Sequence, residues 1–159
     1  MTPAIVQLNK AAIPYTLHEY VHDPATQAYG QEAADKLGLP AVRVFKTLVV
    51  QLDTAALAVA VVPVAAMLNL KSLARAAGAK KAGMADKTLV SRTTGYVLGG
   101  VSPLGQKKRL PSYIDHSAQD FSTIFVSAGR RGLQLELDPH ALAHLLQARF
   151  VPLCAEQAP

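Results

Sequence analysis

A single lysine interrupts an apolar segment that is otherwise typical of a buried strand. Lys46 lies within residues 44–50 (VFKTLVV), where most neighbours are β-branched or aromatic. Since strand side chains alternate between the two faces, Lys46 points either to solvent or into a cleft. A solvent-facing lysine protects a strand against aggregation and is the commoner case. A lysine in a cleft places an ammonium group on a rigid element, where it can bind a phosphate or polarise a carbonyl group.

The second candidate is the segment GGVSPLG at residues 99–105. Glycine lets backbone N–H groups approach a ligand closely, and Ser102 adds a hydroxyl, so such a loop can cradle a phosphate or an oxyanion. The segment lacks the GxxxxGKS/T pattern of P-loops and the GxGxxG pattern of dinucleotide sites, which argues against both classes. An ordinary tight turn explains the same glycines equally well.

This loop leads into three consecutive cations, Lys107, Lys108 and Arg109, and Arg130 and Arg131 follow later in the chain. The chain carries 16 Lys and Arg against 11 Asp and Glu, which gives a net charge of +5. Clustered cations beside a glycine loop attract a phosphate backbone, with an affinity that falls as salt rises. A solvated charged turn is the simpler explanation of the same residues.

The usual protein nucleophiles and metal-binding patterns are missing from the sequence. The five histidines form no HExxH motif, and no GxSxG elbow surrounds a serine. Cys154 is the one cysteine, so an internal disulfide and a cysteine-based metal cluster are excluded, and a reducing cytoplasm fits. We therefore expect neither a metal nor a cofactor.

The elements that must position these residues mix helices and strands without regular alternation. Helices are predicted over residues 3–12, 31–37, 70–77, 87–91 and from residue 139 onward. Strands are predicted over residues 15–20, 43–52, 57–62, 80–85, 113–115, 123–127, 133–137 and 149–152. Several of these strands are hairpin-connected, which predicts an α+β fold with a mostly antiparallel sheet in one domain over residues 1–159.

The apolar segments are too short for a membrane span. The longest apolar run, residues 55–68, falls below the roughly 18 residues that a span needs, and Pro63 interrupts it. The start of the chain, Met1-Thr2-Pro3, has the pattern of a capped helix and not of a signal peptide. We therefore expect a cytoplasmic protein that binds no membrane.

Taken together, several ordered segments resemble the bacterial YbaK/EbsC family. They are MTPA at residues 1–4, HDP at 22–24, FKTL at 45–48, KK at 80–81, MAD at 84–86, TGY at 94–96, GGVSPLGQKK at 99–108 and RGL at 131–133. The resemblance covers nearly the whole chain. It implies a free-standing editing domain similar to the insertion domain of bacterial prolyl-tRNA synthetases, with a mixed, mostly antiparallel curved sheet flanked by helices.

The resemblance also implies an activity, which is hydrolysis of the ester of a mischarged tRNA in trans. The best-known members are Cys-tRNA(Pro) deacylases, and their cysteine-specific branch is thought to use the substrate's own thiol to attack the carbonyl. The implied partners are a mischarged tRNA(Pro) and a complex with prolyl-tRNA synthetase. Neither DNA nor a membrane is implied.

Carried onto this sequence, the resemblance implies catalytic roles for Lys46, Gly99 and Gly100. Lys46 would hold the terminal adenosine phosphate or the substrate carbonyl, and the Gly99-Gly100 backbone would bind the developing oxyanion. The residues expected to bind the substrate are Tyr20, Thr47, Ser102, Pro103 and Glu136, the last by contacting the amino group. The residues expected to bind tRNA are Lys107, Lys108, Arg130 and Arg131.

One departure from the family pattern is Ala128-Gly129-Arg130, where relatives often have Gly-Gly-Lys; this change preserves the charge. Two alternatives stay open. The enzyme could remove another amino acid, such as alanine from tRNA(Pro). The chain could instead be a non-catalytic RNA-binding module that has kept the pocket without turnover.

Overall fold

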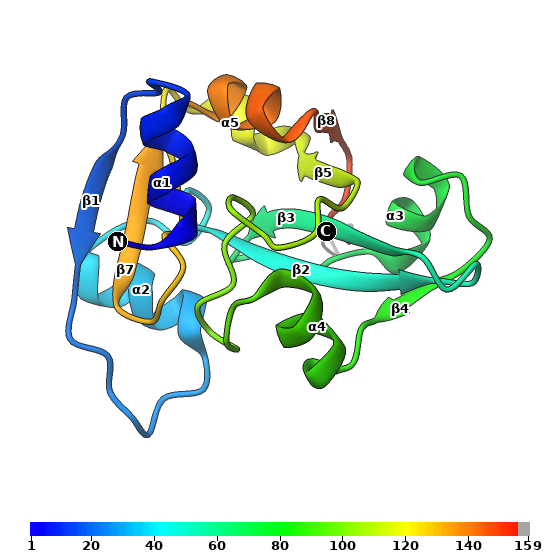
Figure 1. The fold of residues 1–159 in the computed structure, drawn as a ribbon, viewed down its shortest axis with the longest axis horizontal. Helices are drawn as coiled ribbons and strands as arrows, with labels where there is room; N and C mark the ends of the chain where they lie inside the picture. Colours follow the sequence, from blue (N-terminus) through cyan, green and yellow to red (C-terminus); the bar gives the residue numbers. More distant parts are fainter. Residues whose placement is uncertain (156–159) are drawn as a thin grey trace.

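The computed structural model describes residues 1–155; residues 156–159, the last four of the expected domain, lie outside the described residues. Residues 1–155 form five α-helices, one short 3-10 helix and eight strands (Figure 1). The helices are α1 (Pro3–Lys10), α2 (Tyr29–Leu37), α3 (Leu70–Ala76), α4 (Lys87–Thr94), η1 (His116–Asp120) and α5 (Pro139–Leu146). The strands are β1 (Thr16–Glu19), β2 (Phe45–Leu52), β3 (Leu57–Pro63), β4 (Ala82–Met84), β5 (Ser112–Asp115), β6 (Ile124–Ser127), β7 (Leu133–Leu137) and β8 (Arg149–Val151).

Four of the five α-helices begin at a capping side chain that the sequence indicates. These caps each accept a hydrogen bond from a backbone N–H in the first turn, and they are Thr2, Asn69, Asp86 and Asp138. Each cap contributes about 1 kcal/mol to helix stability. Helix α2 is the exception, because Ala28 at its start has no side chain that can cap.

The strands are divided between two sheets. The larger has the order β4-β2-β3-β5-β8, and the smaller has the order β1-β7-β6. Four strand pairs are antiparallel, while β3-β5 and β5-β8 are parallel. The predicted α+β class with mixed, mostly antiparallel pairing is therefore confirmed. The strands do not form one continuous sheet: within residues 1–155, the backbone pairing between the two sheets is a single isolated bridge between Val44 and Phe125.

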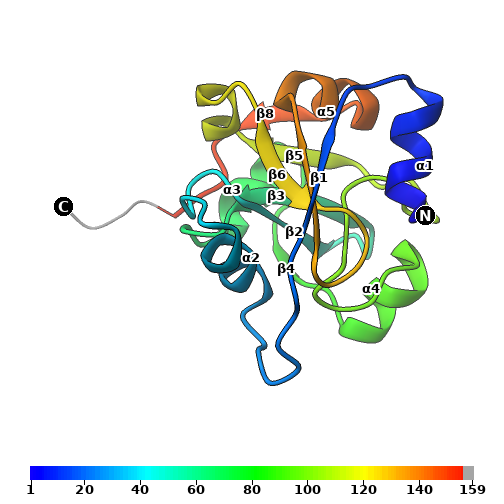
Figure 2. The same cartoon turned by 90° about the vertical axis from the view of Figure 1, so that its left-hand side faces the viewer.

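The main core lies between the two sheets and is closed by helices. It joins Phe45 and Val49 of β2 to Leu135 of β7 and Leu8 of α1. Helices α1 and α2 cover opposite faces of the small sheet, as Figure 2 shows. Leu104 comes from the glycine-rich segment and is fully buried in this core. Burying a leucine side chain contributes about 2 kcal/mol, so Leu104 anchors the segment that carries the candidate glycines.

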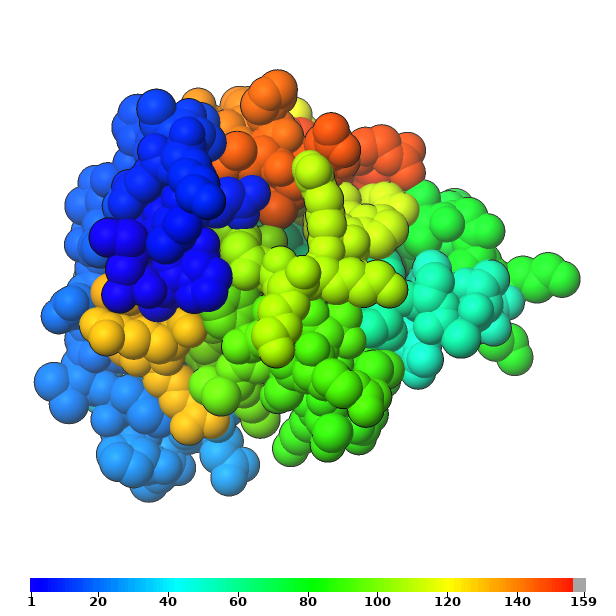
Figure 3. Space-filling model, in the orientation of Figure 1, coloured from blue at the N-terminus to red at the C-terminus, as the bar shows by residue number. Residues whose placement is uncertain are grey.

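On the face shown in Figure 3, the segment around residues 100–110 runs between α1 and α4. The strand β2 extends behind this segment and forms a hairpin with β3, in which Lys46 pairs with Val62. Strand β4 pairs with β2 only from Val50 to Leu52, so it does not reach Lys46. Among residues 1–155, no helix combines the length and the apolar character needed to cross a membrane.

Candidate functional site

Lys46 and the glycine loop meet at one cavity of about 350 Å³. Its walls come from four parts of the fold. They are the start of α2 (residues 28–31), the first half of β2 with the preceding residue (44–48) and Val64 after β3, the loop residues Leu98, Gly99 and Val101, and Ser127 and Gln134 of the β6–β7 hairpin. These segments are far apart in the sequence. The fold therefore brings together the lysine and the glycine loop, which the resemblance assigned to one catalytic site.

Lys46 lines the cavity from β2. It is half-buried, and it forms no salt bridge with any of residues 1–155. The cavity lining contains no Asp or Glu that could neutralise the ammonium group. A cation held on a strand without a counter-ion attracts an anion or a carbonyl oxygen. Of the two positions predicted for Lys46, exposed to solvent or within a cleft, the structure supports the cleft.

Gly99 lies in the left-handed region, with φ at +83°, and lines the cavity. A Cβ atom at this position would lie 2.7 Å from ring atoms of Tyr29, so both the conformation and the packing require glycine. Gly100 does not line the cavity: its N–H donates to the Val97 carbonyl at 2.9 Å. Among residues 1–155, the N–H groups of Gly99 and Val101 donate no hydrogen bond. The available donors are therefore those of Gly99 and Val101, not those of Gly99 and Gly100.

Arg131 holds this loop in place. Its Nε donates to the Leu98 carbonyl at 2.8 Å, and its guanidinium lies 4.9 Å from the centre of the Tyr29 ring. Tyr29 in turn packs against Gly99. A cation over an aromatic face is favourable, so the three residues fix the loop against the start of α2.

Two buried polar atoms without partners belong to the same cavity lining. Among residues 1–155, the Thr47 hydroxyl and the Gln134 Oε1 are the buried side-chain oxygens and nitrogens that form no hydrogen bond. Thr47 and Gln134 both line the cavity. An unsatisfied buried polar group costs about 1–3 kcal/mol, which a ligand with matching groups would offset.

Gln134 was not among the residues expected to bind the substrate, whereas Glu136 was. Both belong to β7, and two residues along a strand share a face. The Glu136 carboxylate accepts hydrogen bonds from Thr123 at 2.6 Å and Arg43 at 3.2 Å, and pairs with His18 at 2.9 Å. The Thr123 hydrogen bond is the largest of the contacts that lower the pKa of Glu136. This carboxylate is fully engaged and does not line the cavity, so the structure does not place Glu136 where its expected role requires.

Three other expected substrate-binding residues also lie outside the lining. Ser102 is fully buried, and its hydroxyl accepts a hydrogen bond from the Leu104 N–H at 3.3 Å. Pro103 lines a different cavity. Tyr20 is half-buried near Gln134, and burial raises its pKa. Of the five residues expected to bind the substrate, only Thr47 lines the cavity.

Ser127 is a cavity residue that the sequence did not single out. It lines the wall, and its Oγ accepts a hydrogen bond from the Gly129 N–H at 3.2 Å. The lining contains no histidine, cysteine or carboxylate that could activate this hydroxyl. Cys154 is not an alternative nucleophile, because burial and the nearby Asp115 raise the pKa of its thiol to about 12.

The expected tRNA-binding cations lie on exposed turns. Lys107 and Lys108 are exposed, and their N–H groups bond to the last turn of α4. Arg130 is exposed and lies 3.6 Å from Glu19 in a surface ion pair. Arg131 is the one of the four that contacts the cavity wall directly, through Leu98 and Tyr29.

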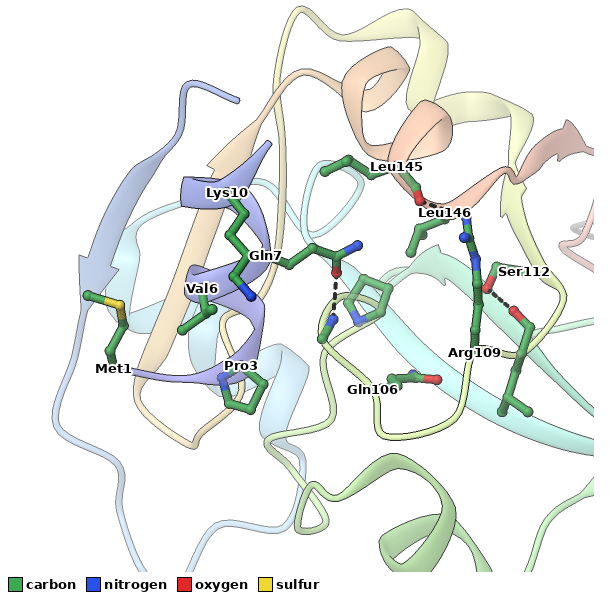
Figure 4. A pocket seen from close by; sticks show the side chains of 13 residues that line it. Met1, Pro3, Val6, Gln7, Lys10, Gln106, Arg109, Ser112, Leu145 and Leu146 are labelled. Carbon is green, nitrogen blue, oxygen red and sulfur yellow. Dashed lines mark hydrogen bonds between the residues drawn. The ribbon is translucent and has the colours of Figure 1, made fainter. Parts of the chain in front are cut away.

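A second cavity of about 500 Å³ lies between α1, residues 103–110 and α5. Figure 4 shows Gln7 and Lys10 on α1 facing it, with Arg109 on the opposite wall beside Leu146. Arg109 donates to the Leu145 carbonyl at 3.0 Å. Neither Lys46 nor Gly99 lines this cavity, so it is separate from the candidate site.

The loop that leads into α2 is held by a buried carboxylate. Glu32 accepts from the Asp23 N–H at 2.8 Å, pairs with His22 at 2.6 Å and lies 3.2 Å from Lys36. Burial acts to raise the pKa of Glu32, but these hydrogen bonds and charges outweigh it and lower the pKa from 4.5 to about 2. The ionised carboxylate therefore positions the start of α2, which forms one wall of the site.

We expect Glu32→Gln to lower the free energy of unfolding by about 2 kcal/mol at pH 7, because three partners lose a charged acceptor. A carboxylate whose pKa is lowered by folding stabilises the protein fully above its ordinary pKa of 4.5, and this stabilisation is lost as the pH falls toward 2. The difference in unfolding free energy between the unmodified protein and Glu32→Gln should therefore become smaller as the pH falls. Urea unfolding between pH 6 and pH 3 measures it. The exposed Glu19→Gln serves as control, and a pH-independent difference would contradict the assignment.

Residues 22–145 match the family model described as an aminoacyl-tRNA editing domain. The chain belongs to this family. It is 37% identical over 156 residues to an Enterococcus faecalis (strain ATCC 700802 / V583) protein provisionally named Cys-tRNA(Pro)/Cys-tRNA(Cys) deacylase EbsC, covering 98% of this chain and 94% of that protein.

Solved structures share the fold of this editing-family member. A hypothetical protein superposes with a TM-score of 0.83 at 24% identity, over 94% of this chain and 99% of the other. A candidate trans-editing enzyme for prolyl tRNA synthetase superposes with a TM-score of 0.79 at 21% identity, over 98% and 99% of the two chains. At these identities the likeness establishes the fold alone.

Proposed function

We propose that this protein hydrolyses the ester of Cys-tRNA(Pro) in trans, using the cavity between Lys46 and Gly99. The observation that carries the proposal is a lysine without a counter-ion in the same cavity lining as the glycine-loop residues Gly99 and Val101, whose N–H groups donate no hydrogen bond within residues 1–155. Such donors stabilise negative charge as it develops on a carbonyl oxygen. Membership of the aminoacyl-tRNA editing family supports an aminoacyl ester as the reacting group.

The cavity lacks a side-chain base, so we assign the nucleophile to the substrate. No histidine, carboxylate or thiol is present in the lining. In the proposed reaction the cysteine sulfur bonds to its own carbonyl carbon, the carbon–oxygen bond to the ribose breaks, and the ribose oxygen takes up a proton. The thiolactone so formed is then opened by water, which completes a net hydrolysis. The N–H groups of Gly99 and Val101 would bind the oxygen that becomes negative.

The size of the cavity suits a small amino acid. Its walls include Val44, Leu48 and Val64, which are apolar and leave about 350 Å³ for the aminoacyl group and the adjoining ribose. Each extra methylene group changes binding in such a pocket by about 1–3 kcal/mol, so size alone separates cysteine weakly from alanine. The requirement for a thiol would supply the remaining selectivity.

The tRNA would be retained mainly by phosphate contacts. Lys107, Lys108, Arg130 and Arg131 lie on exposed turns and would contribute a salt-dependent attraction. We propose that prolyl-tRNA synthetase, in the cytoplasm, provides the selection of tRNA(Pro). Co-elution of the two proteins with tRNA(Pro) in size-exclusion chromatography tests this, and separate elution under saturating conditions argues against it.

A deacylation panel tests the main proposal. Purified protein should release cysteine from Cys-tRNA(Pro) at least about tenfold faster than alanine from Ala-tRNA(Pro), and should leave Pro-tRNA(Pro) intact. Equal rates for cysteine and alanine contradict the thiol-assisted mechanism. If every ester stays intact while the protein still shifts RNA on a gel, the chain is a binding module and not an enzyme.

The variant Gln134→Leu tests whether Gln134 binds the substrate, because it should change the KM without destabilising the fold. The variant removes a buried oxygen that has no partner and also the amide's contact with the Tyr20 hydroxyl, so the free energy of unfolding should change by less than about 1 kcal/mol. We expect the KM for Cys-tRNA(Pro) to rise about tenfold, because the amino group or a ribose hydroxyl of the substrate loses its acceptor. Steady-state deacylation and thermal unfolding give the two readouts. An unchanged KM removes Gln134 from the substrate-binding set.

A further inference from the structure

On the face shown in Figure 3, three neighbouring segments carry cations and no acid. They are α1, residues 102–110 and α4, with residues 102–110 running between the two helices. These segments contain no Asp or Glu, and they hold six of the chain's 16 lysines and arginines, namely Lys10, Lys87, Arg92, Lys107, Lys108 and Arg109. All six side chains are exposed. We call the surface that these six residues form the basic face.

Contacts of the backbone and of the second cavity place five of these cations relative to one another. The backbone N–H groups of Lys107 and Lys108 donate to carbonyls in the last turn of α4, at 3.0 and 3.2 Å. Both lysines are thereby fixed beside Arg92, which lies in the same turn. Lys10 and Arg109 lie on opposite walls of the second cavity, as Figure 4 shows. The basic face therefore extends from the end of α4 to the end of α1.

Within residues 1–155, no ion pair neutralises the basic face. Each ion pair in this part of the chain uses a carboxylate of α2 or of the small sheet, and these are Glu19, Glu32 and Glu136. The acid that precedes α4, Asp86, accepts hydrogen bonds from two N–H groups in the first turn of that helix. Like charges gathered without counter-ions repel one another, so a bound polyanion would relieve this repulsion.

The residue types of the basic face favour a double-stranded RNA over an unpaired strand. Proteins that hold unpaired nucleotides stack the bases on aromatic side chains. Residues 3–10, 87–94 and 102–110 contain no Phe, Tyr or Trp. Exposed lysines and arginines suit the phosphates of a duplex, which a protein contacts without reading the bases.

The basic face continues toward the cavity of Lys46 through residues 95–99. A Cβ atom at Gly95 would lie 3.1 Å from the Lys107 Cγ, so this lysine packs on Gly95. Gly99 lines the cavity, and at most about 14 Å of backbone separates it from Gly95. An ester in the cavity and a duplex on the basic face can therefore belong to one RNA, joined by the unpaired nucleotides at its 3′ end.

We propose that the basic face binds the phosphate backbone of the double-stranded stem next to the 3′ end of the tRNA. The inference rests on the proposed function, because it takes the RNA to be that substrate. It adds Lys10, Lys87 and Arg92 to the cations expected from the sequence. Arg130 and Arg131 lie outside the basic face, since Arg130 pairs with Glu19 and Arg131 is bound to the cavity wall.

Binding of deacylated tRNA(Pro) to the full chain tests the basic face without requiring turnover. The double variant Lys10→Gln/Arg92→Gln removes two of its cations, neither of which lines the cavity of Lys46. We expect the Kd, measured by fluorescence anisotropy in about 0.1 M salt, to rise at least about tenfold. The slope of log Kd against log salt concentration should fall by about 2, because each lost phosphate contact removes about one from it. An unchanged Kd and slope overturn the proposal.

The matched control, Lys71→Gln/Arg75→Gln, removes the same charge from α3 and should leave the Kd within about threefold. Helix α3 packs on the face of β3 that carries Ala60, whereas α4 packs on the core that holds Val59, so the two helices lie on opposite faces of the larger sheet. All four substituted positions are exposed and form no ion pair among residues 1–155, so thermal unfolding should be unaffected. Equal rises in Kd in both double variants would assign the effect to net charge and overturn the proposal.

The preference for a duplex is tested with two short RNAs. A hairpin that has the paired stem and the 3′ end of tRNA(Pro) should bind at least about tenfold more tightly than an unpaired RNA of the same length. This preference should become smaller in Lys10→Gln/Arg92→Gln. Equal affinity of the unmodified protein for the two RNAs contradicts a duplex on the basic face.

Deacylation kinetics distinguish this inference from the function on which it rests. In Lys10→Gln/Arg92→Gln the KM for Cys-tRNA(Pro) should rise at least about tenfold, while the KM for 3′-O-cysteinyl adenosine, which has no stem, should be unchanged. If the unmodified protein hydrolyses neither ester but its hairpin binding depends on Lys10 and Arg92, deacylation is refuted and the basic face is supported. If the double variant keeps its RNA affinity but no longer co-elutes with prolyl-tRNA synthetase, the face binds a protein and the proposal is overturned.

Discussion

Replacing Lys46 by alanine should lower kcat/KM for deacylation of Cys-tRNA(Pro) at least about 100-fold. Lys46 is the one lysine in the cavity lining, and among residues 1–155 it forms no ion pair. Its removal takes away the charge that would stabilise the reacting ester or the phosphate beside it. The fold should be unaffected, because the side chain makes no salt bridge that the protein would lose.

The measurement is single-turnover deacylation alongside urea unfolding. Lys71→Ala is the matched control, since it removes the same charge from an exposed position on α3 outside the cavity. Lys46→Arg keeps the charge but changes the shape of the donor, so an intermediate rate is expected. Turnover preserved in Lys46→Ala would refute the role of this residue, and equal losses in both alanine variants would assign the effect to overall charge.

The second large effect is expected on stability, at Gly105. Its φ is +69°, and an added Cβ atom would lie 2.6 Å from both the Ala4 nitrogen and the Pro3 carbonyl oxygen, and against the Pro3 carbonyl carbon. These are backbone atoms of α1, so no side-chain rotation relieves the overlap. The Gly105 N–H also donates to the Gln7 Oε1 at 2.7 Å. We expect Gly105→Ala to cost about 3 kcal/mol of unfolding free energy.

The variant Gly38→Ala measures the cost of the left-handed backbone conformation without an overlap of the added methyl group with other atoms. Gly38 has a φ of +66°, but a Cβ atom there would meet nothing within 4 Å. It should therefore cost only about 1 kcal/mol. Urea unfolding of both variants at pH 7 gives the comparison. Equal costs would mean that α1 moves to accommodate the methyl group, and that its contact with the loop is not rigid.

Local signals predicted most elements of the fold. Thr2 and Asp138 mark helix starts because capping depends on residues a few positions apart, and these signals are complete in the sequence. The parallel pairing of β3 with β5 was not predicted. It joins Val59 to Ser112, and no local pattern encodes a pairing over that separation. The division into two sheets was missed for the same reason. The η1 turn is local and begins at the capping side chain of Asp115, but it was not predicted.

The site was predicted in part, through residues whose types are unusual for their surroundings. Lys46 stands out in an apolar strand, and Gly99 stands out in a loop, so both were found and both line the cavity. Gln134 has no such contrast, because a polar residue in an alternating strand is ordinary. Only its burial and its unpaired oxygen reveal it. Glu136 was expected instead, as a contact for the amino group, because its strand lies close to the turn that resembles the family.

The cavity draws its walls from residues as early as Ala28 and as late as Gln134. The β2–β3 hairpin can form from neighbouring residues, but the loop of Gly99 and the hairpin of Gln134 must arrive from much later in the chain. During synthesis, a nascent chain that ends before Gln134 therefore lacks part of the cavity wall. The cavity can form only after the ribosome has released most of the polypeptide. Shortening the chain from either end past these residues should abolish the activity outright instead of weakening it by degrees.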